Sequence, residues 1–278
     1  MAQEMTLGET AAEAALGWLG QGQPDRPLWR YIPPLAAAGR VQMAIDRWLL
    51  EECAAGRIGG ALRFYSWSPP ALSLGYHQRS FPPAWRGLRW RGEPVDLVRR
   101  PTGGRTVLHQ GDLTYAVVGS GFATARSQAY REICQFLMAG FAELGLELRY
   151  GEAQAGTARN NPNCFALATG ADLVLADGTK VVGSAQVVQR RVVLQHGSIA
   201  IAVDPALFRQ VFHGEAPPAR SLPLGDGSLQ EQRDRLMEVL TAAAERCFGI
   251  TLRYQPLTAI EWDQVRSLEP AGLVGDRL

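Results

Sequence analysis

The stretch ADLVLADGTKVVGSAQVVQRRVVLQHGSIAIAV, residues 171–203, decides the fold class. It is rich in valine and isoleucine, which fit the pleated, half-buried surface of a sheet. Asp177-Gly178 is a typical hairpin turn pair, and the polar break Gln189–Arg191 separates two further apolar runs. We therefore expect antiparallel strands here that form the centre of a sheet.

On either side of this stretch, helical and strand patterns follow each other irregularly. Apolar residues recur at helical spacing within 128–146, and the patterns from Gly39 to about Gly56 and over 228–248 also predict helices. The runs ALRFYSW (61–67) and PPALSLGY (69–76) predict two short strands. This order favours an α+β domain, with a central mixed or antiparallel sheet flanked by helices, over a doubly wound fold.

Length and composition indicate one main domain in a reducing compartment. We divide the 278 residues into an N-terminal extension at 1–26, a main domain at 27–255 and a C-terminal tail at 256–278. The four cysteines are far apart and form no CxxC pair, so neither a disulfide scaffold nor a metal site is expected. The net charge of +1 provides no field for nucleic acid or an anionic membrane. No stretch has the pattern of a signal peptide or membrane span, so we expect a cytoplasmic protein that binds neither nucleic acid nor a membrane.

The densest cluster of unusual residues is RRPTGGRTVLH, residues 99–109, which follows the apolar run VDLV. Its adjacent glycines allow a sharp turn and a close approach to a ligand, and its arginines suit a carboxylate, a phosphate or a phosphopantetheine arm. Taken alone, the loop is explained as well by an ordinary glycine hairpin with solvated arginines. The candidate substrate-binding residues are Arg99, Arg100, Thr102, Gly103, Gly104, Arg105 and His109.

A second cluster, KVVGSAQ at 180–186, is followed by QHGSI at 195–199 on the next predicted strand. Glycines in adjacent strands remove side chains where a ligand must lie against the sheet. A hairpin with bulges and a buried, hydrogen-bonded histidine would explain the same pattern. The candidate substrate-binding residues are Gly183, Ser184, Ala185, Gln186, His196 and Gly197.

Together, at this order and separation, the two clusters resemble the lipoate/octanoate transfer family, which has the biotin/lipoate protein ligase catalytic domain. The resemblance extends from about Leu28 to Phe212 and is strongest to the LipM-type octanoyltransferases. It rests on RFYSWSPPALSLGYHQ (63–78), RRPTGGRTVLHQGDLTYAVV (99–118), NCFALATGADLVLADGTKVVGSAQ (163–186) and QRRVVLQHGSIAI (189–201). It implies a biotin/lipoate protein ligase-like catalytic domain within 27–255.

The resemblance also implies the chemistry. LipM-type enzymes work without ATP through an acyl-cysteine, which corresponds here to Cys164, followed by Phe165. The lysine that lowers the pKa of this cysteine corresponds to Lys180. Cys164 also lies among turn-forming residues in TARNNPNCF, which predicts a loop over the sheet. The implied reaction transfers an octanoyl group from octanoyl-acyl carrier protein, through a Cys164 thioester, to a lysine of a lipoyl domain such as glycine cleavage H protein, with no metal and no cofactor.

Three other functions remain open. An ATP-dependent lipoate-protein ligase shares the fold but usually has a third glycine where this chain has Arg105, and the stretch that starts at His109 also differs. An amidotransferase that moves octanoyl groups between lipoyl domains differs mainly in its donor. A catalytically silent homologue would bind an acyl carrier or a lipoyl domain, and the presence of both Cys164 and Lys180 argues against it.

Overall fold

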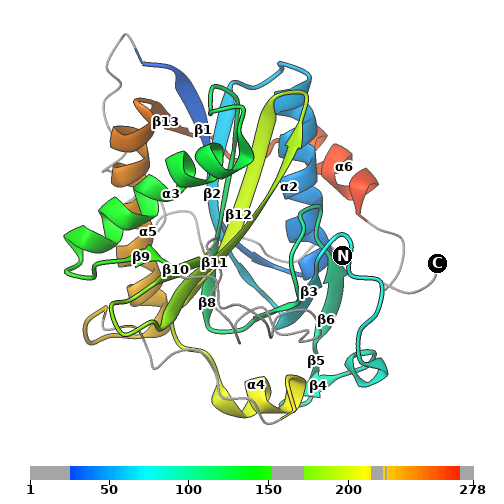
Figure 1. Ribbon diagram of the computed structural model, residues 1–278. Helices are drawn as coiled ribbons and strands as arrows, with labels where there is room; N and C mark the ends of the chain where they lie inside the picture. The colour runs from blue at the N-terminus through cyan, green and yellow to red at the C-terminus, as the bar shows by residue number, and fades with distance from the viewer. Residues whose placement is uncertain (1–25, 152–171, 214–221, 223, 270–278) are drawn as a thin grey trace.

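The computed structural model describes residues 26–151, 172–213, 222 and 224–269, and the structural statements below concern these residues. Their centre is an eight-stranded sheet that consists of β1 (Leu28–Ala37), β2 (Gly60–Trp67), β8 (Asp112–Gly119), β9 (Arg149–Tyr150), β10 (Asp172–Val174), β11 (Lys180–Gln189), β12 (Val192–Ala200) and β13 (Thr251–Tyr254). The spatial order is β13-β1-β2-β8-β12-β11-β10-β9 (Figure 1). β1 runs parallel to β13 and β2, while the other neighbours are antiparallel. The predicted α+β class with a mixed sheet is confirmed.

The strands predicted from residues 171–203 form the part of the sheet that carries the second cluster. β11 and β12 pair in continuous register from Val182 opposite Ile199 to Gln189 opposite Val192. The polar break becomes a two-residue turn in which Arg190 and Arg191 both have positive φ, the backbone that suits the twist of a hairpin. Gly178, with φ of 84°, lies in the turn between β10 and β11.

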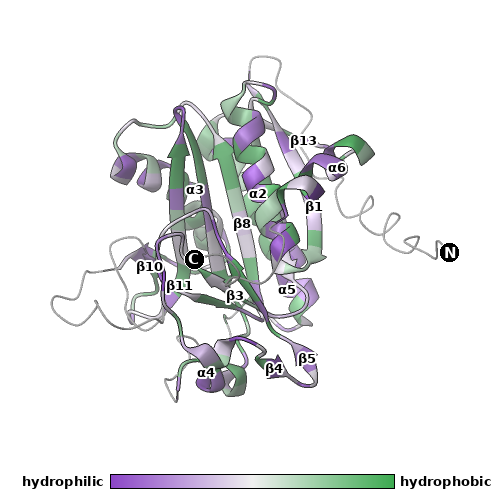
Figure 2. Cartoon of the chain, turned by 90° about the vertical axis from the view of Figure 1, so that its right-hand side faces the viewer, coloured by the Kyte–Doolittle hydropathy of each residue, from purple (hydrophilic) through white to green (hydrophobic). Residues whose placement is uncertain are grey.

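Helices cover both faces of the sheet. α3 (Arg126–Glu143) and α5 (Leu229–Phe248) pack on one face, and α2 (Gly39–Ala54) and α6 (Ala259–Leu268) lie on the other (Figure 1). Because strand side chains alternate, Tyr115 and Val117 of β8 join the α3 and α5 core, whereas Ala116 and Val118 join the α2 core. In Figure 2, α2 shows both hydrophobic and hydrophilic bands, as expected for a helix with one buried side. Within the described residues, no helix combines the length and apolar character needed to cross a membrane.

Residues 256–269, in the segment predicted as a tail, are held against the domain. α6 begins at a capping box in which Thr258 and Glu261 satisfy each other's backbone N–H groups. Glu261 also accepts hydrogen bonds from the buried Arg30 of β1, the shorter at 2.7 Å. Trp48 of α2 donates to Gln264 at 2.9 Å. The predicted extension 1–26, apart from its last residue, and residues 270–278 lie outside the described part of the chain.

A smaller sheet stands beside the α2 face of the large sheet, in the order β6-β3-β7. It consists of β3 (Ala71–Leu74), β6 (Asp96–Arg99) and β7 (Val107–His109). A third apolar cluster joins it to α4 (Pro205–Val211) and to the short helix η1 (Pro83–Trp85). The connection to β6 also includes the small hairpin of β4 (Arg89–Trp90) and β5 (Glu93–Pro94). The loop with the adjacent glycines joins β6 to β7, so this sheet brings the first cluster to the second.

Candidate active site

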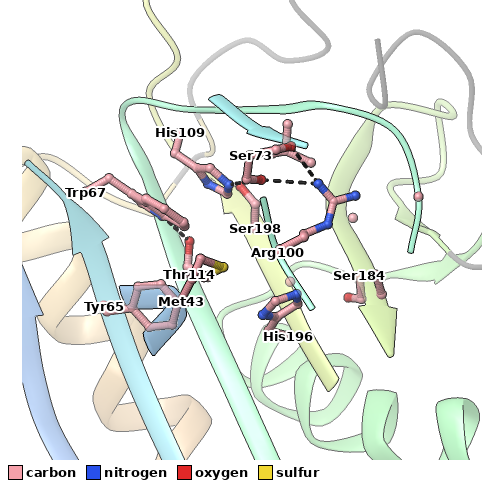
Figure 3. Close-up of a pocket in the computed structure, with 15 residues that line it drawn as sticks. Met43, Tyr65, Trp67, Ser73, Arg100, His109, Thr114, Ser184, His196 and Ser198 are labelled. Atoms are coloured by element: carbon pink, nitrogen blue, oxygen red, sulfur yellow. Dashed lines mark hydrogen bonds between the residues drawn. The ribbon is translucent and has the colours of Figure 1, made fainter. Parts of the chain in front are cut away.

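A pocket lies where the small sheet meets the α2 face of the large sheet (Figure 3). Residues from α2, β2, β3, β7, β8, β11 and β12 line it, together with the glycine loop. Both clusters singled out in the sequence contribute to it. Its lining residues are Met43, Tyr65, Trp67, Ser73, Arg100, Gly104, Val107, His109, Thr114, Gly183, Ser184, Ala185, His196, Gly197 and Ser198.

His109 lies on one side of the pocket in a chain of buried polar groups. Its Nδ1 is 2.8 Å from Asp112 Oδ2, and its Nε2 is 2.9 Å from Ser73 Oγ (Figure 3 shows His109 beside Ser73). A carboxylate only accepts hydrogen bonds, so Nδ1 carries the proton and Nε2 accepts the Ser73 hydroxyl. The ring is stacked on Trp67 at 3.9 Å between centroids. Burial is the main cause that lowers the pKa of His109, so the imidazole is neutral at pH 7.

The Asp112 carboxylate is stabilised as an anion. Its Oδ2 also accepts hydrogen bonds from Ser198 at 2.7 Å and from Thr114 at 3.1 Å. Burial on its own raises the pKa of Asp112, but His109 and the hydroxyl of Ser198 outweigh burial, and the net pKa is lowered. The carboxylate therefore stays charged at neutral pH and holds His109 in one orientation.

His196 forms a second chain of the same kind. Its Nδ1 is 2.8 Å from Asp46 Oδ2 on α2, and its Nε2 is 2.6 Å from Thr102 Oγ1 in the glycine loop. Asp46 also accepts from Tyr65 at 2.9 Å and forms an ion pair with Arg63 at 3.1 Å. Since all five side chains are buried, this chain ties the loop to β12 and α2 with few alternative positions.

Two arginines of the glycine loop, Arg99 and Arg100, bind backbone carbonyl groups. Arg100, 5% exposed, donates from its three guanidinium nitrogens to the carbonyls of Ser73, Gly103 and Arg105 at 2.7–3.2 Å. Arg99 donates to the carbonyls of Gly75, Tyr76 and Gln78 at 2.7–3.3 Å. These contacts fix the shape of the loop; a role of either arginine in substrate binding stays a prediction.

Glycines bring this loop close to β3. A Cβ added to Gly75 would lie 1.9 Å from the carbonyl oxygen of Gly104, and one added to Gly104, where φ is +91°, would lie 2.8 Å from an Arg100 nitrogen. Gly103 differs, because no atom of the described part of the chain lies within 4 Å of its added Cβ. The backbone at Gly103 therefore has open space beside it, as expected for a position that approaches a ligand.

Lys180 reaches the pocket face because of a β-bulge. Asp172 pairs with Gly183 and Leu173 with Val182, but Val174 pairs with Lys180, so one residue of β11 is extra. The bulge places Lys180 on the same face as Gly183, although an odd number of positions separates them. Lys180 is 3% exposed, and its Nζ forms an ion pair with Asp172 Oδ1 at 2.8 Å. A Cβ added to Gly183 would lie 3.0 Å from Lys180 Cε, so the glycine leaves room for the lysine.

The remaining residues of the second cluster divide between the two faces of β11. Ala185 lies opposite His196 on the pocket face. Ser184 lies on the other face and bonds the Tyr115 hydroxyl at 2.8 Å; a Cβ added to Gly197 would be only 2.4 Å from Ser184 Oγ. Gln186 donates to the carbonyl of Arg126 at the start of α3. The side chains of Ser184 and Gln186 thus fix strand positions, and of the two residues Ser184 lines the pocket.

The structure describes three of the four cysteines. Cys53 and Cys134 are buried in α2 and α3, and Cys247 is exposed on α5. Burial raises the pKa of Cys53 to about 12 and that of Cys134 to about 11. These two thiols are therefore poor nucleophiles at neutral pH. Cys164 lies outside the described residues, and its role stays a prediction.

Comparison with known proteins identifies the family of this chain. Residues 38–255 match the family described as lipoyl protein ligase A/B catalytic domain. The chain belongs to this family. Curated relatives named Octanoyltransferase LipM include those of Kyrpidia tusciae, 32% identical over 86% of this chain and 94% of the relative, and of Symbiobacterium thermophilum, 34% identical over 87% and 94%. These matches extend across the fold and both clusters.

Solved structures agree on the fold of the lipoyl ligase family. A T. acidophilum protein described as a lipoate protein ligase, with bound lipoic acid, has a TM-score of 0.68 at 22% identity and covers 86% of this chain and 93% of its own. A bi-partite lipoate protein ligase from Thermoplasma acidophilum, reported with its E2 lipoyl domain, has a TM-score of 0.59 at 17% identity, with 86% and 92% covered. The expected biotin/lipoate protein ligase-like domain is thus confirmed.

Three residues in or beside the pocket of this lipoyl ligase domain were not predicted from the sequence. Asp46 had a detectable signal, because it is a lone acid between the apolar residues of a predicted amphipathic helix. Asp112 follows a glycine shortly after His109, and the two meet because Gly111, at φ +71°, turns the chain between β7 and β8. Ser73 had no signal in its strand, because only the pairing of β3 with β7 brings it beside His109.

Proposed function

We propose that this chain is an octanoyltransferase that moves an octanoyl group from octanoyl-acyl carrier protein, through a thioester on Cys164, to a lysine of a lipoyl domain. The observation that carries the proposal is kinship: relatives named Octanoyltransferase LipM share 32–34% of residues over 86–87% of the chain. The pocket supports it, because buried polar groups and glycine backbone line it and an ion-paired lysine lies beside Gly183.

The first step is a thioester exchange. The Cys164 thiolate attacks the octanoyl carbonyl, the carbon–sulfur bond to the carrier breaks, and the carrier leaves as a thiolate that takes up a proton. Lys180 contributes positive charge on this face of the sheet, where its ammonium is paired with the carboxylate of Asp172 at 2.8 Å. An ammonium about 4 Å from a developing anion stabilises it by up to about 4 kcal/mol at an effective dielectric constant near 20.

The second step forms the amide. The acceptor lysine amine attacks the octanoyl carbonyl, the bond to Cys164 breaks, and the cysteine leaves as a thiolate. An amide is more stable than a thioester, so the transfer needs no nucleotide. Among the described residues, no atom lies within 4 Å of a Cβ added to Gly103, next to the pocket-lining Gly104, which leaves space beside the backbone for part of a substrate.

The direct test is intact-mass analysis and peptide mapping after incubation with octanoyl-acyl carrier protein in the absence of ATP. We expect one octanoyl group on Cys164, its loss on addition of a lipoyl domain, and an octanoyl-lysine on that domain. Cys164→Ala abolishes both products, whereas Cys247→Ser, an exposed cysteine on α5, is the matched control that keeps them. Modification only with ATP and free octanoate would replace the proposal with a ligase.

Two further arms test for an amidotransferase and for a silent homologue. The rate of Cys164 acylation is measured with two donors, an octanoylated lipoyl domain and octanoyl-acyl carrier protein. A faster rate with the octanoylated lipoyl domain indicates an amidotransferase. Binding of the lipoyl domain without any covalent product indicates a silent homologue. Lys180→Met keeps the length of the side chain but not its charge, and a rate of Cys164 acylation equal to that of the wild type would remove Lys180 from the mechanism.

A further inference from the structure

The roles given above do not account for every proton in the amide-forming step. This inference rests on the proposed function. An acceptor lysine enters as an ammonium with a pKa near 10.4 and ends as an amide N–H, so it gives up two protons. One is lost to solvent when the ammonium becomes the reactive amine. The other leaves the nitrogen as the amide bond forms, and it needs a base close by.

Lys180 is badly suited to be that base. Its Nζ lies 2.8 Å from the carboxylate of Asp172, and both groups are buried. Lysine pairs with a carboxylate as an ammonium, which has no lone pair to accept a proton. Lys180 therefore contributes charge, and another group has to remove the proton.

The pocket contains a neutral base with a connected hydroxyl. His109 Nδ1–H donates a hydrogen bond to the Asp112 carboxylate. The lone pair of His109 Nε2 is therefore directed at Ser73 Oγ, 2.9 Å away. Arg100 donates to the same Ser73 oxygen at 3.2 Å. A hydroxyl oxygen has two lone pairs, so Ser73 has one left for an incoming N–H while its own proton points at His109.

We propose that Ser73, His109 and Asp112 form a proton relay for the acceptor lysine. As the amine nitrogen bonds to the octanoyl carbon, its N–H proton passes to Ser73 Oγ, and the Ser73 hydroxyl proton passes to His109 Nε2. The carbon–sulfur bond then breaks and the electron pair stays on the Cys164 sulfur. The imidazolium returns its proton to that thiolate or to water, and Asp112 stabilises the positive ring in between.

The groups around His109 agree with this role. Burial lowers its pKa most, Asp112 on β8 raises it, and the positive charge of Arg100 and the nearby His196 lower it further. Arg233 of α5 donates to the backbone carbonyl of Asp112 and holds that strand end in place. The ring is thus neutral over the physiological range and still has an anion beside it once protonated.

His196 shows why the second aspartate–histidine–hydroxyl chain is structural. Its hydroxyl partner, Thr102, does not line the pocket, whereas Ser73 does. Its carboxylate, Asp46, is also committed to Arg63 and Tyr65. In that chain, the hydroxyl bound to the histidine does not line the pocket, although His196 does. Geometry alone therefore separates the relay from its near copy.

The experiment isolates the second step. Octanoyl-enzyme is prepared from the wild type, His109→Gln and Ser73→Ala, then mixed rapidly with lipoyl domain, and octanoyl-lysine is measured between pH 5 and pH 9. We expect His109→Gln to slow transfer about 10²–10⁴-fold and Ser73→Ala by a similar factor, while Cys164 acylation changes by less than about 3-fold. His213→Gln, an exposed histidine that does not line the pocket, is the control.

The pH profile gives a readout that a structural role would not produce. In the wild type, the rate of transfer rises with pH because the acceptor amine loses a proton. Below the lowered pKa of His109, the rate falls more steeply with decreasing pH, because protonation of His109 removes the base as well. His109→Gln lacks that additional dependence. The relay would be overturned if His109→Gln slowed Cys164 acylation and transfer by the same factor, or if its pH profile of transfer equalled that of the wild type. Neither result would contradict the proposed octanoyltransferase function. A wild type that forms no acyl-Cys164 refutes the proposed function instead. Ser73→Ala provides the same comparison if His109→Gln does not fold.

Discussion

Asp46 is the residue whose replacement tests the architecture of the site most sharply. It is fully buried on α2, where its carboxylate contacts Arg63, Tyr65 and His196 at 3.1, 2.9 and 2.8 Å. Asp46→Ala leaves the guanidinium of Arg63, itself 1% exposed, without its counterion. Gln42 still binds that guanidinium but carries no charge.

The expected loss of stability is large. Removing one partner of a buried ion pair costs about 3–5 kcal/mol, because the other charge stays buried without compensation. A Tyr65 hydroxyl without its acceptor adds about 1 kcal/mol. We therefore expect Asp46→Ala to lower the free energy of unfolding by about 4–6 kcal/mol, out of about 5–15 kcal/mol for a typical domain. Asp46→Asn keeps the shape and loses less.

Urea unfolding followed by tryptophan fluorescence and circular dichroism measures the change. Glu51→Ala on the same helix is the matched control, because the Glu51–Arg47 pair is exposed and contributes less than about 1 kcal/mol. The double variant Asp46→Leu with Arg63→Met, which replaces the pair by apolar groups, should recover most of the loss. If Asp46→Ala and Glu51→Ala agree within about 1 kcal/mol, the buried network is not what holds α2 to the sheet.

Three further outcomes follow from the geometry. Gly197→Ala should destabilise the domain by about 1–3 kcal/mol in the same urea assay, because its new methyl group would lie 2.4 Å from Ser184 Oγ; unchanged stability would show that the strands separate easily. Gly103→Ala has open space, so its stability should stay within about 0.5 kcal/mol of the wild type, and a fall in transfer rate alone would show that a ligand lies against it. At pH 8, iodoacetamide should alkylate Cys247 far faster than Cys134, whose pKa of about 11 leaves about one thiolate in a thousand; comparable rates, followed by peptide mapping, would contradict its burial.

The sequence predicted those parts of the fold that have a local pattern. The helix from Gly39, the helix within 128–146, and the turns at Asp177-Gly178 and Gln189–Arg191 are all present. Periodicity and turn chemistry act over a few residues, so one sequence reveals them. β1 was missed because Pro33-Pro34 interrupts its pattern; the structure accommodates them where the register between β1 and β2 shifts.

The site was predictable only in its motifs. The glycine loop and the second cluster do meet at one pocket, and that meeting followed from the resemblance and not from their separate patterns. The direction of the arginines was not predictable, because neighbouring carbonyl groups compete with any ligand for a guanidinium and only the folded loop decides between them. Ser73 meets His109 across 36 residues of chain and Asp46 meets His196 across 150, and no local pattern reports such pairings.

The extra residue of β11, between Lys180 and Val182, has a consequence for how related chains are compared. In a regular strand, two side chains share a face only when an even number of positions separates them. Lys180 shares a face with Gly183 at a separation of three because the bulge absorbs one residue. In an alignment, the spacing from this lysine to the glycine and the presence of the bulge therefore have to be considered together, because a related chain with a regular strand keeps its lysine on this face only at an even separation.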